Sequence, residues 1–416
     1  MLPQALSNGL CSLVPGSERA CLAAELWIDA AGRKRRQRFE RAIMRSAARL
    51  TYEEVEAARQ GRAARPLPLP AERLDALYGA FAALDRWRRA RGALALDLVE
   101  HRVVLDGDQR PIAIEARPRL DSHRLIEEFM ILANVAAAEA LETMRQPALY
   151  RVHDAPNPEK VAALGEFLAE LGIPGLALAK GERVRPELFN RVLARAAAIP
   201  EAPLINELVL RAQAQAVYSP ANIGHFGLAL PRYVHFTSPI RRYADLLVHR
   251  ALIAGVSREA GGARRDPLAG APQGGAELAQ IGQHVSATER RAAAAERAAV
   301  DRYRATLLGG SIGSAFAGRI TGVAPFGLFV TLPESGADGL VPVASLPGDY
   351  YEHDARRHRL VGRRSSRIFA LGDSVVVRLV EADPIGGRLL LRLADDTAAV
   401  RPVAGLRRSR AGRRRR

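Results

Sequence analysis

The stretch YVHFTSPIRRYADLLVHR, residues 233–250, holds aromatic side chains, a Ser-Pro turn, two adjacent arginines and a carboxylate. Thr-Ser-Pro at residues 237–239 favours a tight turn, so the stretch predicts a strand, a turn and a helix in succession. Arg241 and Arg242 would then fall in the first helical turn, where basic side chains oppose the helix dipole. A phosphate bound opposite them would explain their position. The alternative is an ordinary surface ion pair between Arg242 or Arg250 and Asp245.

The chain is long enough, and apolar enough, to bury a sizeable hydrophobic core. Its 416 residues are 48% hydrophobic, and this length predicts two or three domains. No apolar run is long enough to cross a membrane, and the first ten residues lack the pattern of a signal peptide, so we expect a cytoplasmic protein. Cys11 and Cys21 have no CxxC spacing, which argues against a zinc site or a disulfide framework.

The positive charge of the chain is concentrated at its C-terminal end. Net charge is +16, and residues 401–416 contain eight arginines and no acid. With almost no apolar content, residues 397–416 are expected to form a disordered basic tail that attracts nucleic acid. A solvated tail without a specific role is the alternative.

The first half of the chain carries both strand and helix patterns. Apolar and polar residues alternate over residues 22–28, and Ala31-Gly32 is expected to turn the chain toward a second strand ending near Ile43. Apolar residues recur at helical spacing after Pro70, with Gly92 just beyond the end of that helix. These patterns predict an α+β body.

The second half of the body is expected to be helical. Residues 258–276 are rich in Gly, Pro and Ala without periodicity, and they predict a flexible loop. Ser286-Ala287-Thr288-Glu289 has the form of a capping box, so a long helix is expected to start there and run toward Leu308.

Gly309-Gly310 is expected to end this body. The segments FAGRITGV, GLFVTL, GLVPV, DSVVVRLVEA and RLLLRL then read as five short strands, an order that fits an OB-type barrel over residues 311–396. The expected organisation is therefore an α+β domain at residues 1–310, an all-β barrel and the basic tail.

No metal site is expected from the residues themselves. A two-metal hydrolytic site needs several carboxylates around ions roughly 3.5–4 Å apart. Asp106 and Asp108 come nearest, but they flank Gly107 in an apparent hairpin turn, where Asp and Gly serve the backbone. Asp395 and Asp396 read as a solvated chain end. The histidines of the arginine-rich region, His225, His235 and His249, lie on separate expected elements and read as structural or RNA-contacting.

The segment HFTSPIRRYADLLVHR closely resembles the signature of the RNB family of 3′-to-5′ exoribonucleases, and of its ribonuclease R branch in particular. Further blocks resemble the family in the same order: MLPQALSNGLCSL at residues 1–13, ARLTY ending at Tyr52, LIEEFMILAN at 125–134, RVHD at 151–154 and GHFGLAL at 224–230. The resemblance implies an α+β nuclease that degrades single-stranded RNA to nucleoside 5′-monophosphates with Mg²⁺. In the family an upstream aspartate cluster holds the Mg²⁺ ions, and this sequence begins after it.

The resemblance also implies roles for individual residues. Arg241 matches the arginine that contacts the scissile phosphate, Tyr52 the tyrosine that packs against the terminal nucleotide, and Glu127 the carboxylate that positions its sugar. RNA contacts are expected from the residues around this arginine, namely Arg242, Tyr243, His235, Phe236 and His225. Leu96 stands where relatives often carry a phenylalanine that clamps the last bases, which implies a looser grip.

The barrel segment GRITGVAPFGLFVTLPESGADGLVPVASL resembles the S-one-type RNA-binding domain that ends such nucleases. Exposed aromatics of these barrels stack on bases while nearby cations follow the RNA backbone. Phe326, Phe329 and Arg319 are the expected contacts, with core packing as the alternative for Phe329. Pro342 stands where the family often has histidine, which implies the loss of one polar contact.

The sequence therefore predicts the C-terminal portion of a 3′-to-5′ exoribonuclease without its metal-binding half. A start assigned too late, a gene split in two, or a truncated protein would each explain this. In the first two cases the missing N-terminal half is an expected partner, besides single-stranded RNA. In the third case the chain is a catalytically inactive RNA-binding module.

Overall fold

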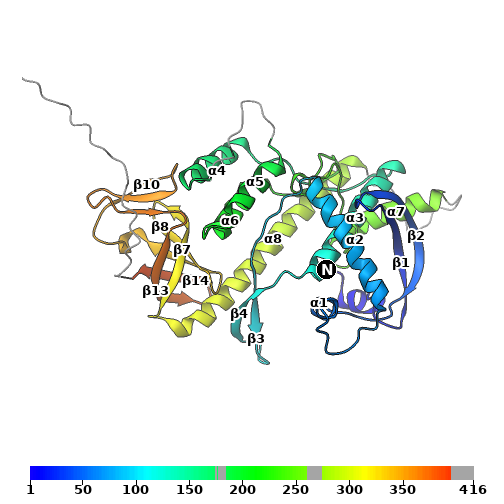
Figure 1. Ribbon diagram of the computed structural model, residues 1–416, viewed down its shortest axis with the longest axis horizontal. Coiled ribbons are helices and arrows are strands. Elements are labelled where there is room, and N and C mark those ends of the chain that lie inside the picture. The colour runs from blue at the N-terminus through cyan, green and yellow to red at the C-terminus, as the bar shows by residue number, and fades with distance from the viewer. Residues whose placement is uncertain (174–175, 177–183, 260–273, 395–416) are drawn as a thin grey trace, which may run out of the picture. The chain divides into compact units, whose positions relative to one another are not determined.

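The computed structural model describes residues 1–173, 176, 184–259 and 274–394. Its contacts divide the chain into two units, one of Met1–Leu98 with Pro118–Ala293, the other of Val99–Arg117 with the chain from Ala294 onward (Figure 1). The division falls inside the last long helix rather than at Gly309-Gly310, because Ala305 and Leu308 near the end of that helix are buried in the core of the barrel. The expected basic tail lies outside the described residues.

The first unit combines a long hairpin with helices. In chain order its elements are η1 (Ala5–Leu10), β1 (Glu18–Ile28), β2 (Lys34–Arg45), α1 (Tyr52–Arg59), α2 (Ala71–Ala90), α3 (Asp121–Thr143), β5 (Tyr150–Val152), α4 (Pro158–Glu170), α5 (Pro186–Ala196), α6 (Ala202–Ala212), β6 (Val217–Ser219), η2 (Phe226–Leu228), α7 (Tyr243–Glu259) and most of α8 (Gly275–Leu308). Strands β1 and β2 pair antiparallel, as do β5 and β6.

The hairpin of β1 and β2 confirms the turn expected at Ala31-Gly32. Asp29 Oδ1 accepts hydrogen bonds from the backbone N–H groups of Ala31 and Arg33, both at 2.9 Å. Gly32 has φ +77°, and a Cβ there would lie 2.1 Å from the carbonyl oxygen of Ala83, so both backbone conformation and space require glycine.

Small side chains on α3 form the centre of the first unit. Ala136, Ala137 and Leu141 are fully buried, and the cluster around them includes Phe39 from β2 and Phe236, whose rings meet edge to face at 5.6 Å. Because alanine lets neighbouring elements approach closely, the hairpin and α7 both pack near α3 (Figure 1).

Two helix starts differ from the expectation. Helix α7 begins at Tyr243, so Arg241 and Arg242 lie in the preceding turn and not in the first helical turn. Helix α8 begins at Gly275, so Ser286 is interior and does not cap it. Its hydroxyl instead donates to Gly282 O at 2.7 Å and accepts from Tyr218 N at 2.9 Å. Of the expected loop at 258–276, the two ends are helical, and residues 260–273 are outside the described part.

The second unit contains the expected barrel, closed in the order β13-β14-β9-β8-β7. Its elements are β3 (Glu100–Leu105), β4 (Pro111–Arg117), the end of α8, η3 (Gly309–Ser311), β7 (Ala315–Ala324), β8 (Gly327–Leu332), β9 (Ala337–Pro342), η4 (Val343–Ser345), β10 (Tyr351–Asp354), β11 (Arg359–Gly362), β12 (Ile368–Ala370), β13 (Ser374–Asp383) and β14 (Arg388–Leu393). The three-stranded sheet β10-β11-β12 was not expected from the sequence.

Among the described residues, none of the helices combines the length and the apolar character that a membrane span requires.

Candidate nucleic-acid interface

The turn that carries the two arginines is organised by Asp245. This carboxylate is fully buried, and it forms a two-pronged ion pair with Arg242, with Nε and Nη2 each 2.8 Å from one of its oxygens. Its Oδ1 also accepts the backbone N–H of Ser238 at 2.7 Å. The backbone N–H groups of Arg241 and Arg242 donate to Ser238 O at 3.2 and 3.1 Å. Arg242 therefore holds the turn together in a buried pair, not in the surface pair considered from the sequence.

The side chain of Arg241 is not part of this hydrogen-bond network. It is exposed and forms no side-chain hydrogen bond or ion pair with the residues that the structure describes. The neighbouring residue Ile240 accepts a backbone hydrogen bond from Leu2 at 2.9 Å, so the start of the chain also supports the turn. A guanidinium on a well-supported turn, with its donors unused, is suited to bind a phosphate.

A cluster of imidazole and phenol rings lies next to this turn. Ring centroids of His225 and Tyr233 are 5.4 Å apart, those of Tyr233 and His235 are 5.6 Å apart, and those of His235 and Tyr218 are also 5.6 Å apart. The sequence expectation that His225 and His235 belong to separate elements is correct, yet the fold brings both rings against Tyr233. His249 lies elsewhere and stacks on Phe236 at 4.6 Å.

The imidazoles of this cluster are held neutral. Burial lowers the pKa of His225 to about 3, with His153 as the next cause, and burial together with Arg242 lowers the pKa of His235 to about 2. The hydrogen bonds agree, since Nδ1 of His225 accepts from Leu228 N at 3.2 Å and Nδ1 of His235 is 2.8 Å from the hydroxyl of Tyr218. Neutral rings add no charge beside the arginines and offer only hydrogen bonds and stacking to RNA.

These lowered pKa values predict a loss of stability in mild acid. The unfolded histidines titrate near pH 6.5, so the stability due to the neutral rings is complete above that pH and decreases below it. At pH 5 each of His225 and His235 should cost about 2 kcal/mol of unfolding free energy. Urea denaturation at pH 7 and pH 5 measures this, and His235→Gln should remove about half of the combined effect. An unchanged pH dependence in this variant would contradict the assignment.

Tyr52 and Glu127 are brought near each other by the start of α3. Tyr52, the first residue of α1, stacks on His123 with ring centroids 4.1 Å apart. His123 and Glu127 are four residues apart on α3 and so share one face. The exposed fraction of Tyr52 is 38%, which leaves ring surface available beyond the stack. The structure thus places both expected nucleotide contacts on neighbouring surfaces of the first unit.

Glu127 forms ion pairs with two arginines. Its two oxygens contact Arg88 Nη1 at 3.1 Å and Arg119 Nη2 at 2.6 Å. Arg88 also pairs with the buried Glu128 at 2.6 Å. This arrangement fixes the orientation of the carboxylate before any ligand binds.

Sequence reasoning missed three arginines of this region. Besides Arg88, Arg91 donates to Leu228 O at 2.9 Å, and its buried Nη2 has no hydrogen-bond partner among the described residues. Arg151 lies over the Tyr218 ring at 4.8 Å and pairs with Glu289 at 2.6 Å. The run RWRRARG at residues 86–92 was the available signal for Arg88 and Arg91, but an arginine-rich chain makes each single arginine a weak one.

The remaining expected contacts of the first unit separate into exposed and buried residues. Tyr243 is 48% exposed at the start of α7, next to the arginine turn. Phe236 is only 6% exposed and packs against Phe39, so the expectation that it contacts RNA is corrected to a core role. Its backbone N–H donates to the buried Asn134 Oδ1 at 2.8 Å, which fixes the segment that leads into the turn. This segment forms a single β-bridge at Val234 and is not the strand that the sequence predicted.

On the barrel, both phenylalanines are exposed. Phe326 is 57% and Phe329 is 40% exposed, and their rings meet edge to face at 5.9 Å. Phe329 lies opposite Gly322, whose missing side chain leaves room for the ring. Arg319 lies opposite Thr331, two residues from Phe329, so it shares this face, although its Nη1 donates to Gly372 O at 3.1 Å. Core packing is therefore excluded for Phe329.

The described residues do not fit a catalytic metal. They contain no group of three or more His, Cys, Asp or Glu side chains that could hold an ion. Asp106 accepts from the backbone N–H groups of Asp108 and Arg110 at 2.9 and 2.8 Å, as the hairpin-turn interpretation predicted. Asp395 and Asp396 lie outside the described residues.

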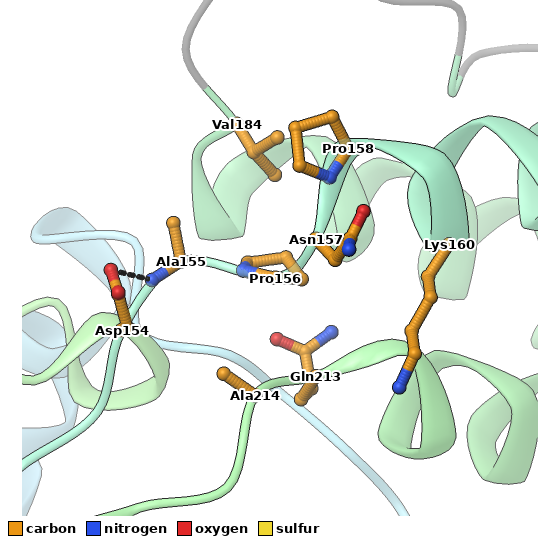
Figure 2. A pocket seen from close by; sticks show the side chains of 9 residues that line it. All are labelled: Asp154, Ala155, Pro156, Asn157, Pro158, Lys160, Val184, Gln213 and Ala214. Carbon is orange, nitrogen blue, oxygen red and sulfur yellow. Dashed lines mark hydrogen bonds between the residues drawn. The ribbon is translucent and has the colours of Figure 1, made fainter.

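A cavity of about 790 Å³ lies at the start of α4 (Figure 2). Its walls are formed by Asp154, Ala155, Pro156, Asn157, Pro158, Lys160, Val184, Gln213 and Ala214. Figure 2 shows the amide of Gln213 directed toward Pro156 and Asn157, and its buried Oε1 has no hydrogen-bond partner among the described residues. None of the residues expected at the RNA site lines this cavity, so it is separate from the candidate interface.

Comparison with protein families gives two matches. Residues 1–258 match the RNB domain, and residues 311–390 match the S1 RNA binding domain. Ribonuclease R of Escherichia coli is 40% identical over 382 residues, which cover 91% of this chain and 47% of that protein. Ribonuclease R of Aquifex aeolicus is 39% identical over 397 residues, covering 95% of this chain and 55% of its own length. The chain thus spans about half the length of the curated relatives it matches.

Solved structures show the same architecture. The apo form of Mycoplasma genitalium RNase R matches with a TM-score of 0.86 and 30% identity, over 94% of this chain and 60% of that one. The same enzyme in complex with ribose methylated single-stranded RNA matches with a TM-score of 0.87 and 29% identity, with the same coverage.

Proposed function

Since the RNB domain matches 258 of its 416 residues, the chain belongs to the RNB family, and we propose that it supplies the RNA- and phosphate-binding part of a ribonuclease R-like 3′-to-5′ exoribonuclease. The substrate would be single-stranded RNA and the products nucleoside 5′-monophosphates. Arg241 is the observation that carries the proposal, because the Asp245 network supports its turn and its own donors have no partner among the described residues.

The chemistry proposed for this chain is electrostatic. Phosphodiester hydrolysis builds negative charge on the non-bridging oxygens of the scissile phosphate, and a guanidinium placed beside them lowers the barrier. Glu127, oriented by Arg88 and Arg119, would accept hydrogen bonds from the hydroxyl groups of the terminal sugar. Tyr52 would stack on the terminal base. Phe326 and Phe329 would stack on further bases of the RNA.

RNB-family nucleases are metal-dependent, and the resemblance proposes Mg²⁺ as the metal. The described residues offer no ligand group for it. The proposal therefore assigns binding and charge neutralisation to this chain and no step of metal chemistry. A cytoplasmic location is proposed in addition, which agrees with the two free cysteines.

The second candidate function is an RNA-binding module that does not cut RNA. The lack of a metal-ligand group among the described residues favours it. It shares every contact proposed above and differs only in turnover, so a degradation assay separates the two.

The deciding experiment incubates 5′-labelled single-stranded RNA with the purified chain and Mg²⁺, alone and with the upstream half of a ribonuclease R supplied in trans. RNA retention without cutting by the chain alone, with stepwise 3′ shortening after addition of the other half, supports the exoribonuclease. Retention without rescue supports the module. Failure to retain RNA at all would contradict both proposals.

The basic end of the chain predicts the salt dependence of RNA binding. Each neutralised phosphate contributes about 0.7 to the slope of log K against log salt for single strands. Deleting residues 401–416, with their eight arginines, should therefore flatten the slope by up to about six units. Fluorescence anisotropy titrations at several salt concentrations measure it, and an unchanged slope would show that the tail does not contact RNA.

A further inference from the structure

The small sheet β10-β11-β12 presents an exposed aromatic ring on its outer face. Tyr350, just before β10, is 73% exposed, while the next residue, Tyr351, is buried at 8% and packs on Phe369 at 5.6 Å between ring centroids. This alternation is that of a strand with one face on the core. Tyr350 therefore faces outward directly before a strand whose first residue, Tyr351, is part of the barrel core.

An arginine is paired with this ring across the strands. The N–H of Arg363 donates to Tyr350 O at 2.9 Å, which extends the β10-β11 ladder by one step beyond the Tyr351 and Gly362 pair. The Arg363 guanidinium lies over the Tyr350 ring at 5.3 Å from its centroid. A single guanidinium covers one face of a ring at most, and the high exposure of Tyr350 shows that the rest remains accessible.

Asp349 makes the support of this ring rigid. Its carboxylate accepts the backbone N–H groups of Arg364 and Ser365, at 3.0 and 2.6 Å, and the hydroxyl of Ser365 at 2.6 Å. It also accepts the N–H of Tyr350 at 2.7 Å. These bonds join the segment before β10 to the segment after β11, so little backbone entropy would be lost on binding.

The charge around the ring favours a polyanion. Residues 347–371 contain six arginines against three acids. Asp349 is engaged by backbone donors, Glu352 by Arg363 at 2.7 Å and Asp354 by Arg359 at 3.0 Å. The acids are thus engaged locally, and the excess of arginine sets a positive potential around an exposed aromatic face. Single-stranded nucleic acids are bound by this combination of ring and cations.

We propose that Tyr350 and Arg363 form a second RNA-stacking platform on the barrel, where a base of single-stranded RNA stacks on the Tyr350 ring and the surrounding arginines follow the phosphates. This inference rests on the proposed RNA-binding function. The platform is distinct from the Phe326 and Phe329 face, since it lies on the sheet β10-β11-β12 and not on β7 and β8 of the barrel. It also connects to that face, because Gly372, two residues after β12, accepts a hydrogen bond from Arg319.

The test measures binding of a fluorescent uridine oligomer to the full chain by anisotropy. Base stacking on an aromatic contributes about 1–3 kcal/mol, so Tyr350→Ala should weaken binding by about tenfold. Tyr350→Phe keeps the ring and should bind like the unaltered chain. Because the tyrosine is neutral, Tyr350→Ala should leave the salt slope unchanged, whereas Arg364→Ala, which removes an exposed arginine next to the platform, should lower it by about 0.7. Ile385→Ala, which truncates an 84% exposed side chain between β13 and β14, is the matched control and should have no effect.

The outcomes separate this inference from the proposed function. Loss of affinity in Tyr350→Ala with rescue by Tyr350→Phe supports the platform, as does ultraviolet crosslinking of the oligomer to the peptide that contains Tyr350. Full affinity in Tyr350→Ala together with weakened binding in Phe326→Ala overturns the platform alone, and leaves Tyr350 as a solvated residue or a protein contact. An unaltered chain that does not bind RNA overturns the proposed function and the platform with it.

Discussion

Replacing Arg241 with alanine is expected to slow hydrolysis by at least about a hundredfold in an enzyme reconstituted from this chain and the metal-binding half. Removing one preorganised donor to developing charge typically has an effect of this size. The side chain is exposed and has no hydrogen-bond partner among the described residues, so its loss should leave the fold intact. RNA affinity should change little, because one phosphate contact among many contributes a small part of the binding free energy.

The measurement compares single-turnover rates with anisotropy titrations on the same preparations. Arg241→Lys tests geometry, since an ammonium keeps the charge but cannot form two parallel hydrogen bonds to a phosphate. Arg250→Ala, on α7 and also exposed, is the matched control for loss of a surface arginine and should turn over normally. Equal turnover by Arg241→Ala and Arg250→Ala would remove Arg241 from the proposed site.

The features that the sequence predicted correctly depend on short-range patterns. The alternation of apolar residues in five segments predicted the closed barrel, and the Asp-Gly turn at residues 106–108 predicted a hairpin. The helix after Pro70 was likewise readable from its spacing and from Gly92 beyond its end. In each case the residues that determine the structure lie within one strand, turn or helix.

The incorrect predictions concern elements whose structure depends on residues that are distant in the sequence. Ser286 has the sequence form of a cap, but α8 extends upstream of it, because its hydroxyl can bond Gly282 within the helix and Tyr218 from β6. The sheet β10-β11-β12 was missed because its turns depend on Asp349 bonding to residues 364 and 365, fifteen and sixteen positions away. A single sequence does not show such partners.

The candidate site likewise contains residues that the sequence predicted and residues that only the fold revealed. The arginine turn and the two residues proposed as nucleotide contacts were singled out from motifs. By contrast, Arg88, Arg91 and Arg151 became visible only when the fold placed them beside Glu127, Leu228 and Tyr218. Phe236 was misassigned because its motif contains several aromatics, and only burial distinguishes the ring that packs inside from those available to RNA.

Asp245 gives the largest expected effect on stability. Replacing it with alanine removes the partner of Arg242, whose side chain is only 16% exposed, and leaves the Ser238 N–H without its acceptor. Breaking a buried ion pair from one side typically costs about 3–5 kcal/mol, because the remaining charge stays buried and unpaired. Urea denaturation of the first unit should therefore show a large decrease in its midpoint. For comparison, Glu207→Ala breaks the exposed pair with Arg211 and should cost about 0.5 kcal/mol or less.

A double variant separates the cost of the unpaired Arg242 charge from the cost of the lost Ser238 hydrogen bond. If the penalty comes from the unpaired cation, Asp245→Ala with Arg242→Ala should be more stable than Asp245→Ala alone, and the two substitutions should be strongly non-additive. Asp245→Asn keeps an acceptor for Ser238 and should fall between the unaltered chain and Asp245→Ala. Additive effects would mean that Arg242 finds another partner when Asp245 is lost, so the carboxylate would not organise the turn. Non-additivity would instead show that the buried pair of Asp245 and Arg242 stabilises the turn next to Arg241.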